Sequence, residues 1–335
     1  MFAVAAAFYL FVSLFAVDDY PILSWERNGK TIQGRIVVDL NWRGENHTNE
    51  IDYKNIGVWT EGNALNQRLV TVNPWGNTVG QRLYLLAEEG DNYELLDLVG
   101  SELTYDVDIS QIPCGLNAAL YTVEMAPGGA KAPEVGAAYG SGYCDAQFLG
   151  ADDLGCGEFD IWEANRAATV YTTHACTQTG QFAKGSATCD SNGCGYNSYR
   201  DSNEHNFYGN ASSFTVDSSK PFTVITQFLS SGGALTSVVR KYIQNGRTIT
   251  STGALDGNRC TSSQYSLAQM GKSLSNGHVL AFSLWDSSNG LDWLDAGNNG
   301  PCSGQDESAT YLEKNFPDAT ITWSNIRFGP IDSTY

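Results

Sequence analysis

Short runs of alternating apolar and polar residues recur along the chain and limit it to folds built from β-strands. The clearest run is LTYDVDI at residues 103–109, in which Leu103, Tyr105, Val107 and Ile109 alternate with polar side chains. A period of two places these side chains on one buried face of a strand. Comparable runs are RIVVDLNW (35–42), QRLYLLAE (81–88), FTVITQF (222–228), HVLAFSLW (278–285) and ATITWSNIRF (319–328).

The segments between these runs carry turn signals. Asn28-Gly29 and Asn245-Gly246 are typical of two-residue hairpin turns, in which both residues take a positive φ. The 35 glycines and the scarcity of long helical patterns indicate many strands joined by turns and long loops. We therefore predict an all-β sandwich of two antiparallel sheets, in a single domain over residues 18–335.

The first 17 residues, MFAVAAAFYLFVSLFAV, carry no charged side chain and are too short to cross a bilayer comfortably. We interpret residues 1–17 as a signal peptide and predict a secreted, extracellular protein. The segment lacks a basic residue, so a membrane anchor is the alternative. No later apolar run is long enough to span a membrane.

Eight cysteines in a chain that carries an export signal favour disulfide bonds. A zinc site is the alternative, but it would need closer pairs than Cys189 and Cys194, which have four residues between them. Eight cysteines allow 105 pairings, and their spacing does not choose among them.

The charge of the chain is strongly negative, with a formal net charge of −18. A polyanion such as nucleic acid, or an anionic membrane surface, would be repelled, whereas a neutral partner would not. The same charge also keeps an exported protein soluble. We expect a monomer with no nucleic-acid or membrane partner after signal removal.

The segment GCGEFDIWEANRAA at residues 155–168 places Glu158, Asp160 and Glu163 within six residues. Phe159, Ile161 and Trp162 favour a strand over a solvated acidic loop. On a regular strand Glu163 would point away from the other two acids. A one-residue bulge near Ile161 or Trp162 would bring all three to one face.

Three aligned acids repel one another, so a cation, a proton or a function must compensate. Calcium is one reading, although it prefers loops rich in Gly, Asp and Asn. The other is a glycosidase pair, in which an ionised carboxylate attacks a sugar carbon and a protonated one protonates the departing oxygen. Two Glu carboxyls about 5 Å apart on a bent strand would suit a retaining mechanism.

GEFDIWEAN resembles the signature strand of glycoside hydrolase family seven, the cellulases with a β-jelly-roll fold. The resemblance extends over VVDLNWR, GQRLYLL, DVDISQIPCGLNAALY, GSGYCDAQ, THAC, CGYNSYR, FYG, LAFSLWD, DWLDAGNNGPCSG and SNIRFGPI, all in the same order. It implies a jelly roll whose long loops form a substrate cleft, with no cofactor and no metal. Within it Glu158 is the nucleophile, Glu163 the acid/base, and Asp160 the residue that hydrogen-bonds to the nucleophile and tunes it. His174 sits beside the acid/base at the cleavage point.

The resemblance also implies the remaining site residues. Cleft tryptophans, whose planes stack on the apolar faces of sugar rings, match Trp42, Trp285 and Trp293. Polar residues near the cut sugar match Asn117, Tyr121, Asp145 and Gln147, and further cleft arginines match Arg82 and Arg200. The implied disulfides pair Cys114 with Cys302, Cys144 with Cys156, Cys176 with Cys189, and Cys194 with Cys260.

Loop lengths separate the two kinds of cellulase in this family. Only FLGADDLGC stands between GYCDAQ and the acidic strand, where tunnel-shaped members carry a long covering loop. The stretch from Cys176 to Cys189 is also short, and Gly44 stands where tunnel enzymes have an entrance tryptophan. We therefore predict an endo-acting 1,4-β-glucanase with a β-1,4-glucan substrate; the alternatives are a cellobiohydrolase acting from chain ends and a non-catalytic β-glucan-binding jelly roll.

Two sequons, at Asn46 and Asn210, predict N-glycans on surface loops, with unmodified loops as the alternative.

Overall fold

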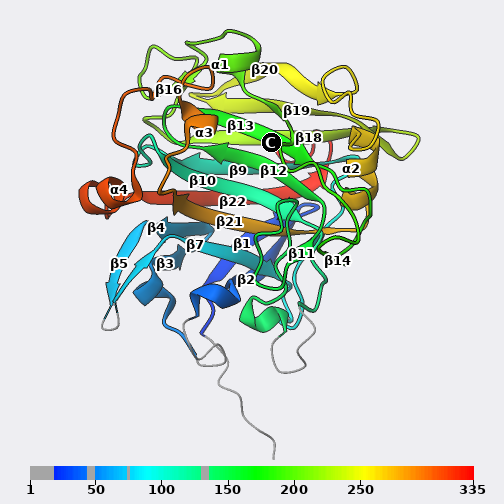
Figure 1. Ribbon diagram of the computed structural model, residues 1–335, viewed down its shortest axis with the longest axis horizontal. Helices are drawn as coiled ribbons and strands as arrows, with labels where there is room; N and C mark the ends of the chain where they lie inside the picture. The colour runs from blue at the N-terminus through cyan, green and yellow to red at the C-terminus, as the bar shows by residue number, and fades with distance from the viewer. Residues whose placement is uncertain (1–18, 44–49, 74–75, 130–135) are drawn as a thin grey trace, which may run out of the picture.

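The computed structural model describes residues 19–43, 50–73, 76–129 and 136–335. Residues 1–17, Gly44 and the Asn46 sequon lie outside these ranges. In the described part of the chain, two curved layers of antiparallel strands pack face to face, and loops and short helices surround one face (Figure 1). The predicted all-β sandwich is therefore confirmed.

The front layer presents a concave face toward the viewer in Figure 1. Its strands follow the order β15 (Cys194–Tyr196), β13 (Thr169–His174), β12 (Glu158–Ala164), β10 (Leu116–Val123), β21 (His278–Asp286), β7 (Gln81–Leu86) and β2 (Lys30–Val38). The back layer follows the order β1 (Ile22–Arg27), β22 (Thr320–Pro330), β9 (Ser101–Asp108), β18 (Phe222–Ser231), β19 (Ala234–Gln244) and β20 (Arg247–Asp256).

The two layers are joined at β2, so their strands form one continuous hydrogen-bonded path. Arg35 of β2 is in register with Ile22 of β1 and also with Leu86 of β7. The one parallel contact along the path is the short pairing of β1 with β22. Shorter strands complete the described fold: β3 (Val58–Glu61), β4 (Ala64–Arg68), β5 (Val70–Asn73), β6 (Gly76–Val79), β8 (Leu95–Leu96), β11 (Leu154–Gly155), β14 (Phe182–Ala183), β16 (Tyr208–Gly209) and β17 (Val216–Asp217).

Helices are short and lie in the connections. The α-helices are α1 (Ser198–Asp201), α2 (Leu267–Leu274), α3 (Asp292–Asp295) and α4 (Ala309–Asn315), and the 3-10 turns are η1 (Leu40–Trp42), η2 (Tyr53–Ile56) and η3 (Ala137–Tyr139). The run at 35–42 is only partly a strand: β2 ends at Val38, and Asp39 accepts a hydrogen bond from the Asn41 amide and starts η1. Trp42 is the last residue of this turn.

The core lies between the two layers and is rich in aromatic side chains. Phe159 of β12 meets Phe228 of β18 with ring centroids 5.0 Å apart, and Trp162 meets Tyr105 of β9 at 6.5 Å. Leu103, Tyr105 and Val107 are buried in this core, as their alternation predicts. The apolar side of β12 is therefore anchored, and its other side is free to carry polar groups.

Local turn chemistry also follows the sequence. Asn28 and Gly29 between β1 and β2, and Asn245 and Gly246 between β19 and β20, all take positive φ, as both predicted hairpin turns require. The structure contains four disulfides, which are the pairs implied by the family resemblance: Cys114–Cys302, Cys144–Cys156, Cys176–Cys189 and Cys194–Cys260.

Candidate active site

A bulge in β12 brings the three acids to one face of the front layer. Between Asp160 and Glu163 the strand advances three residues, while the facing segment of β13 advances two, from Thr172 to Val170. Its register with β10 shifts in the same region. One extra residue on β12 reverses the alternation beyond it, so Glu158, Asp160 and Glu163 all line one cavity. The predicted bulge is confirmed.

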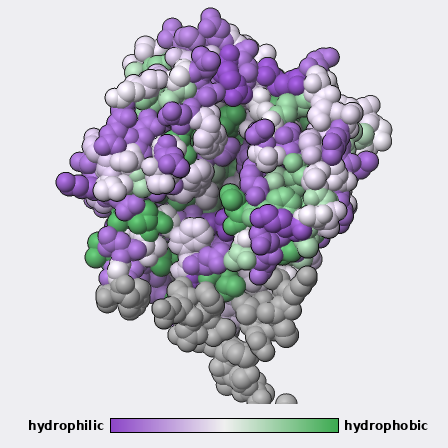
Figure 2. Space-filling model, viewed as in Figure 1, coloured by the Kyte–Doolittle hydropathy of each residue, from purple (hydrophilic) through white to green (hydrophobic). Residues whose placement is uncertain are grey.

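The cavity has a volume of about 690 Å³ and opens on the concave face, where Figure 2 shows a furrow across the strands. Most of the residues that the sequence assigned to a site line it together with the three acids. They are Trp42, Arg82, Tyr121, Asp145, Gln147, His174, Arg200, Trp285 and Trp293.

Asn117 differs from the expectation that it contacts substrate. It is fully buried in β10 and does not line the cavity. Its amide donates a hydrogen bond to Glu163 Oε1 at 3.0 Å, and its side-chain oxygen accepts one from the Ala164 amide at 3.1 Å. The family match places Asn117 correctly beside the catalytic acids, but its side chain contacts Glu163 and does not reach the cavity. Asn117 therefore orients Glu163.

His174 and Asp160 form a buried ion pair. His174 Nε2 lies 3.0 Å from Asp160 Oδ2, and His174 Nδ1 lies 2.8 Å from the Asp190 carbonyl oxygen, which accepts from it. Burial alone would lower the pKa of His174, but the hydrogen bond to Asp160 and the charges of Asp160 and Glu158 raise it to about 10. The imidazole is therefore positively charged among the three acids and offsets part of their repulsion.

Burial raises the pKa of Glu163 to about 8, with a further contribution from the negative charge of Asp160. Burial and the charges of Asp160 and Asp145 raise the pKa of Glu158 as well, whereas His174 and the Ala146 amide lower it. The Ala146 amide donates to Glu158 Oε2 at 3.2 Å. The net effect raises the pKa of both glutamates, so Glu163 keeps a proton at neutral pH. The two carboxyl groups differ in their hydrogen-bond donors, which are the Ala146 amide for Glu158 and Asn117 for Glu163.

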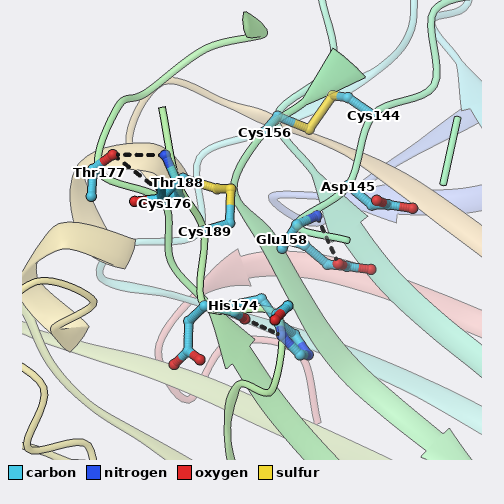
Figure 3. The surroundings of a disulfide bond; sticks show 12 residues. Cys144, Asp145, Cys156, Glu158, His174, Cys176, Thr177, Thr188 and Cys189 are labelled. Atoms are coloured by element: carbon cyan, nitrogen blue, oxygen red, sulfur yellow. Dashed lines mark hydrogen bonds between the residues drawn. A yellow bond between two sulfur atoms is a disulfide. The ribbon is translucent and has the colours of Figure 1, made fainter. Parts of the chain in front are cut away.

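Two disulfides fix the strand ends beside these acids (Figure 3). Cys156, two residues before Glu158, is bonded to Cys144, and Cys176, two residues after His174, is bonded to Cys189. Glu158 and His174 are in register across β12 and β13. The Cys144–Cys156 bond also holds Asp145 close to Glu158. Each disulfide closes a short loop and restricts the motion of the groups that it carries.

Three tryptophans, Trp42, Trp285 and Trp293, line the cavity. The rings of Trp285 and Trp293 lie nearly parallel, with centroids 6.4 Å apart, and Trp293 is 46% exposed. Arg82, which also lines the cavity, lies 5.4 Å from the ring of Trp42 and pairs with Asp39 at 2.9 Å. Flat, partly exposed aromatic planes are suited to the apolar faces of sugar rings.

Several residues that line the cavity were not identified from the sequence. Thr172 and Val170 of β13 belong to this group, as do Ser283 of β21 and Tyr143. Alternation along β13 was a usable signal for Thr172, since it stands two residues before His174. Tyr143 carried no such signal, because it lies in a loop and its ring meets Arg82 only in the folded chain.

Potential metal ligands occur together at one place in the described residues, away from these acids. Cys114, Asp295, Cys302 and Glu307 have ligand atoms within 4.8 Å of one another. Cys114 and Cys302 form a disulfide, so neither can supply a thiolate. The remaining two carboxylates fall short of the six to eight oxygen ligands that calcium prefers.

Comparisons with a family model, with known sequences and with solved structures all point to one family of glycoside hydrolases. The model of Glycosyl hydrolase family 7 matches residues 44–152, 149–256 and 252–335. A probable endo-beta-1,4-glucanase of Aspergillus terreus is 40% identical over 326 residues, covering 85% of this chain and 76% of the relative. The solved Humicola insolens endocellulase is 34% identical with a TM-score of 0.86, covering 95% of this chain and 98% of its own. A solved Daphnia pulex family 7 cellobiohydrolase is 28% identical with a TM-score of 0.85, covering 96% and 99%.

Proposed function

The chain belongs to glycosyl hydrolase family 7, and on this premise we propose that it is an endo-acting 1,4-β-glucanase that hydrolyses cellulose with retention of anomeric configuration. One observation carries the proposal: a single bulged strand presents Glu158 and Glu163 to the same cavity, with different partners. Glu163, with a pKa raised to about 8, holds a proton at neutral pH. Glu158 accepts from the Ala146 amide, a bond that favours its ionised form, although burial and the neighbouring acids raise its pKa overall. A retaining glycosidase needs this division between an acid and a nucleophile.

The reaction has two steps. Glu158 attacks the anomeric carbon while Glu163 gives its proton to the departing glucosyl oxygen, and a glycosyl ester forms on Glu158. Glu163, now ionised, then takes a proton from a water molecule that attacks the same carbon, which releases the sugar and restores both carboxyl groups. Asp160, paired with His174, tunes Glu158 through its charge, and Asn117 orients Glu163.

An endo mode is supported by the open rim of the cavity. Leu149 lines the cavity and is 72% exposed, in the short segment between Asp145 and β11. A chain can enter such a groove from the side, without threading. A cellobiohydrolase is the second candidate, because the Daphnia pulex enzyme shares the fold with a TM-score of 0.85.

Product distribution separates the two modes. We expect the protein to release reducing ends into both the soluble and the insoluble fractions of amorphous cellulose, and to lower the viscosity of a soluble cellulose derivative early in the reaction. The check is to measure reducing ends in both fractions over time. A soluble product consisting almost entirely of cellobiose, with few new insoluble ends, would assign the cellobiohydrolase mode instead.

The pH profile of kcat/KM should reflect the two glutamates. Glu163 must be protonated to act, so we expect activity to fall as the pH rises through about 8, the pKa of the free enzyme. Glu158 must be ionised, so activity should fall on the acid side at a pH above the usual range of a glutamate. Initial rates on a soluble oligosaccharide across pH give both limbs. An alkaline limb near the unperturbed glutamate pKa would be inconsistent with a proton held on Glu163.

Secretion and a monomeric state remain part of the proposal. No helix in the described residues has the length and apolar composition that a membrane crossing requires. The four disulfides are typical of an oxidising compartment. Asn210 lies in an exposed loop, where a glycan would be accommodated. The substrate we propose is a neutral β-1,4-glucan, and the net charge of −18 disfavours nucleic acid as a partner.

A further inference from the structure

Arg240 lies in the core directly behind the bulge of β12. It belongs to β19 in the back layer, is 1% exposed and does not line the cavity. Within the described part of the chain it forms no ion pair. Burying a guanidinium group without a carboxylate partner is costly, so its position needs an explanation in terms of the groups that it contacts.

The hydrogen bonds of Arg240 connect the back layer to the bulge. Its Nε donates to Thr226 Oγ1 at 3.0 Å, and Thr226 is its cross-strand neighbour on β18. Its Nη2 donates to the carbonyl oxygen of Ile161. Ile161 is in register with no residue of β10 or β13. A bulge leaves its extra residue without ladder partners, and a buried carbonyl group without a donor is unfavourable.

Aromatic rings fix the direction of the guanidinium group. Its central carbon lies 4.5 Å from the ring centroid of Tyr171 and 5.6 Å from that of Trp162. Tyr171 is the β13 residue between the pairs that flank the bulge, and Trp162 belongs to the bulge itself. Arg240 therefore contacts the bulge through both strands, and its planar fork has little freedom to turn.

We propose that Arg240 is the positioning residue that sets the conformation of the bulge and thereby aims the carboxyl group of Glu163 at the departing oxygen. This inference rests on the proposed function. Glu163 follows Ile161 by two residues, so a rotation of the peptide plane at Ile161 moves the start of the segment that carries the acid. Glu158 and Asp160 precede the bulge, where the ladder with β13 is regular, so the nucleophile is held independently of Arg240.

The test compares two substrates that differ in their need for an acid. Cellotetraose requires protonation of its leaving sugar, whereas 2,4-dinitrophenyl β-cellobioside releases a weakly basic phenolate that does not. For Arg240→Met we expect kcat/KM on cellotetraose to fall about 100-fold, as for a misplaced catalytic group, and kcat/KM on the dinitrophenyl substrate to stay within about threefold. Arg240→Lys, which keeps one donor, should restore part of the loss on cellotetraose.

Two further variants separate positioning from simple loss of stability. Val238→Ala removes a fully buried side chain from the same face of β19 and leaves the bond to Ile161 in place, so it should lower Tm and leave the ratio of the two kcat/KM values unchanged. Thr226→Val removes the acceptor that holds the Arg240 Nε. It should lower kcat/KM on cellotetraose less than Arg240→Met does, with the same selectivity for that substrate. It takes the place of Arg240→Met if that variant does not fold.

The inference is overturned if Arg240→Met, or Thr226→Val in its place, lowers kcat/KM on both substrates by the same factor or on neither. A wild-type protein that cleaves neither substrate contradicts the proposed function itself, and this inference with it. A wild-type protein that cleaves both, with variants that show no selectivity, contradicts the role of Arg240 alone.

Discussion

Glu158→Gln should reduce hydrolysis of cellotetraose by about 10⁴-fold or more, which is the scale at which loss of a nucleophile collapses a covalent mechanism. The substitution keeps the shape of the side chain and removes the attacking oxygen anion. It also removes a carboxyl group whose pKa burial and neighbouring acids raise, so the variant should fold and bind cellotetraose with a Kd close to that of the wild type. Calorimetric titration and initial rates on one preparation give both results.

Glu307→Gln is a matched control, because Glu307 is also a buried glutamate but lies outside the catalytic cavity. It should retain nearly full activity. Undiminished hydrolysis by Glu158→Gln would contradict the nucleophile assignment. The same experiment tests the non-catalytic alternative. A β-glucan-binding jelly roll without catalysis would bind cellotetraose but show no turnover even in the wild type, whereas the enzyme loses turnover only in the variant.

Glu163→Ala should lower kcat/KM on cellotetraose by about 10²- to 10⁴-fold, the usual contribution of a general acid. It should lower kcat/KM on 2,4-dinitrophenyl β-cellobioside far less, because the phenolate leaves without a proton. Turnover of that substrate would then be limited by hydrolysis of the ester on Glu158, since no base activates the water. Added azide, which attacks without a base, should accelerate that step and yield a glycosyl azide.

The azide experiment distinguishes the two glutamates. Glu158→Gln forms no glycosyl ester, so azide has no intermediate to attack and should not accelerate the residual hydrolysis by this variant. Loss of activity on both substrates by the same factor in Glu163→Ala, without azide acceleration, would contradict the acid/base role. The raised pKa of about 8 at Glu163 gives this prediction its physical basis, because it keeps the acid protonated over the neutral range.

The conformation of the acidic strand could be predicted from the sequence because two features of the strand, its alternation and its bulge, depend only on neighbouring residues. Alternation assigns Phe159 and Ile161 to the core and Glu158 and Asp160 to the other face. The need to bring Glu163 to that same face then requires one extra residue, and the registers of β12 with β10 and β13 show it. Both features depend only on the direction of side chains along one strand, which the order of the residues sets.

Contacts between distant segments were not predicted in the same way. Asn117 was placed at the sugar, but it is buried and donates to Glu163. The alternation of Val238, Arg240 and Tyr242 places Arg240 on the buried face of β19, yet nothing in that run indicates that its hydrogen bond goes to Ile161, 79 residues away. Partner choice depends on how the two layers are stacked, and local pattern carries no information about that stacking.

The stereochemistry of the first product tests the central claim most directly, namely that Glu158 and Glu163 on one bulged strand act as a nucleophile and an acid/base. Proton NMR of cellotetraose hydrolysis, followed faster than mutarotation, measures the anomer released by the enzyme. Two displacements at the same carbon predict that the β-anomer appears first and the α-anomer only later, by mutarotation. Initial release of the α-anomer would mean a single displacement by water and would contradict a glycosyl ester on Glu158.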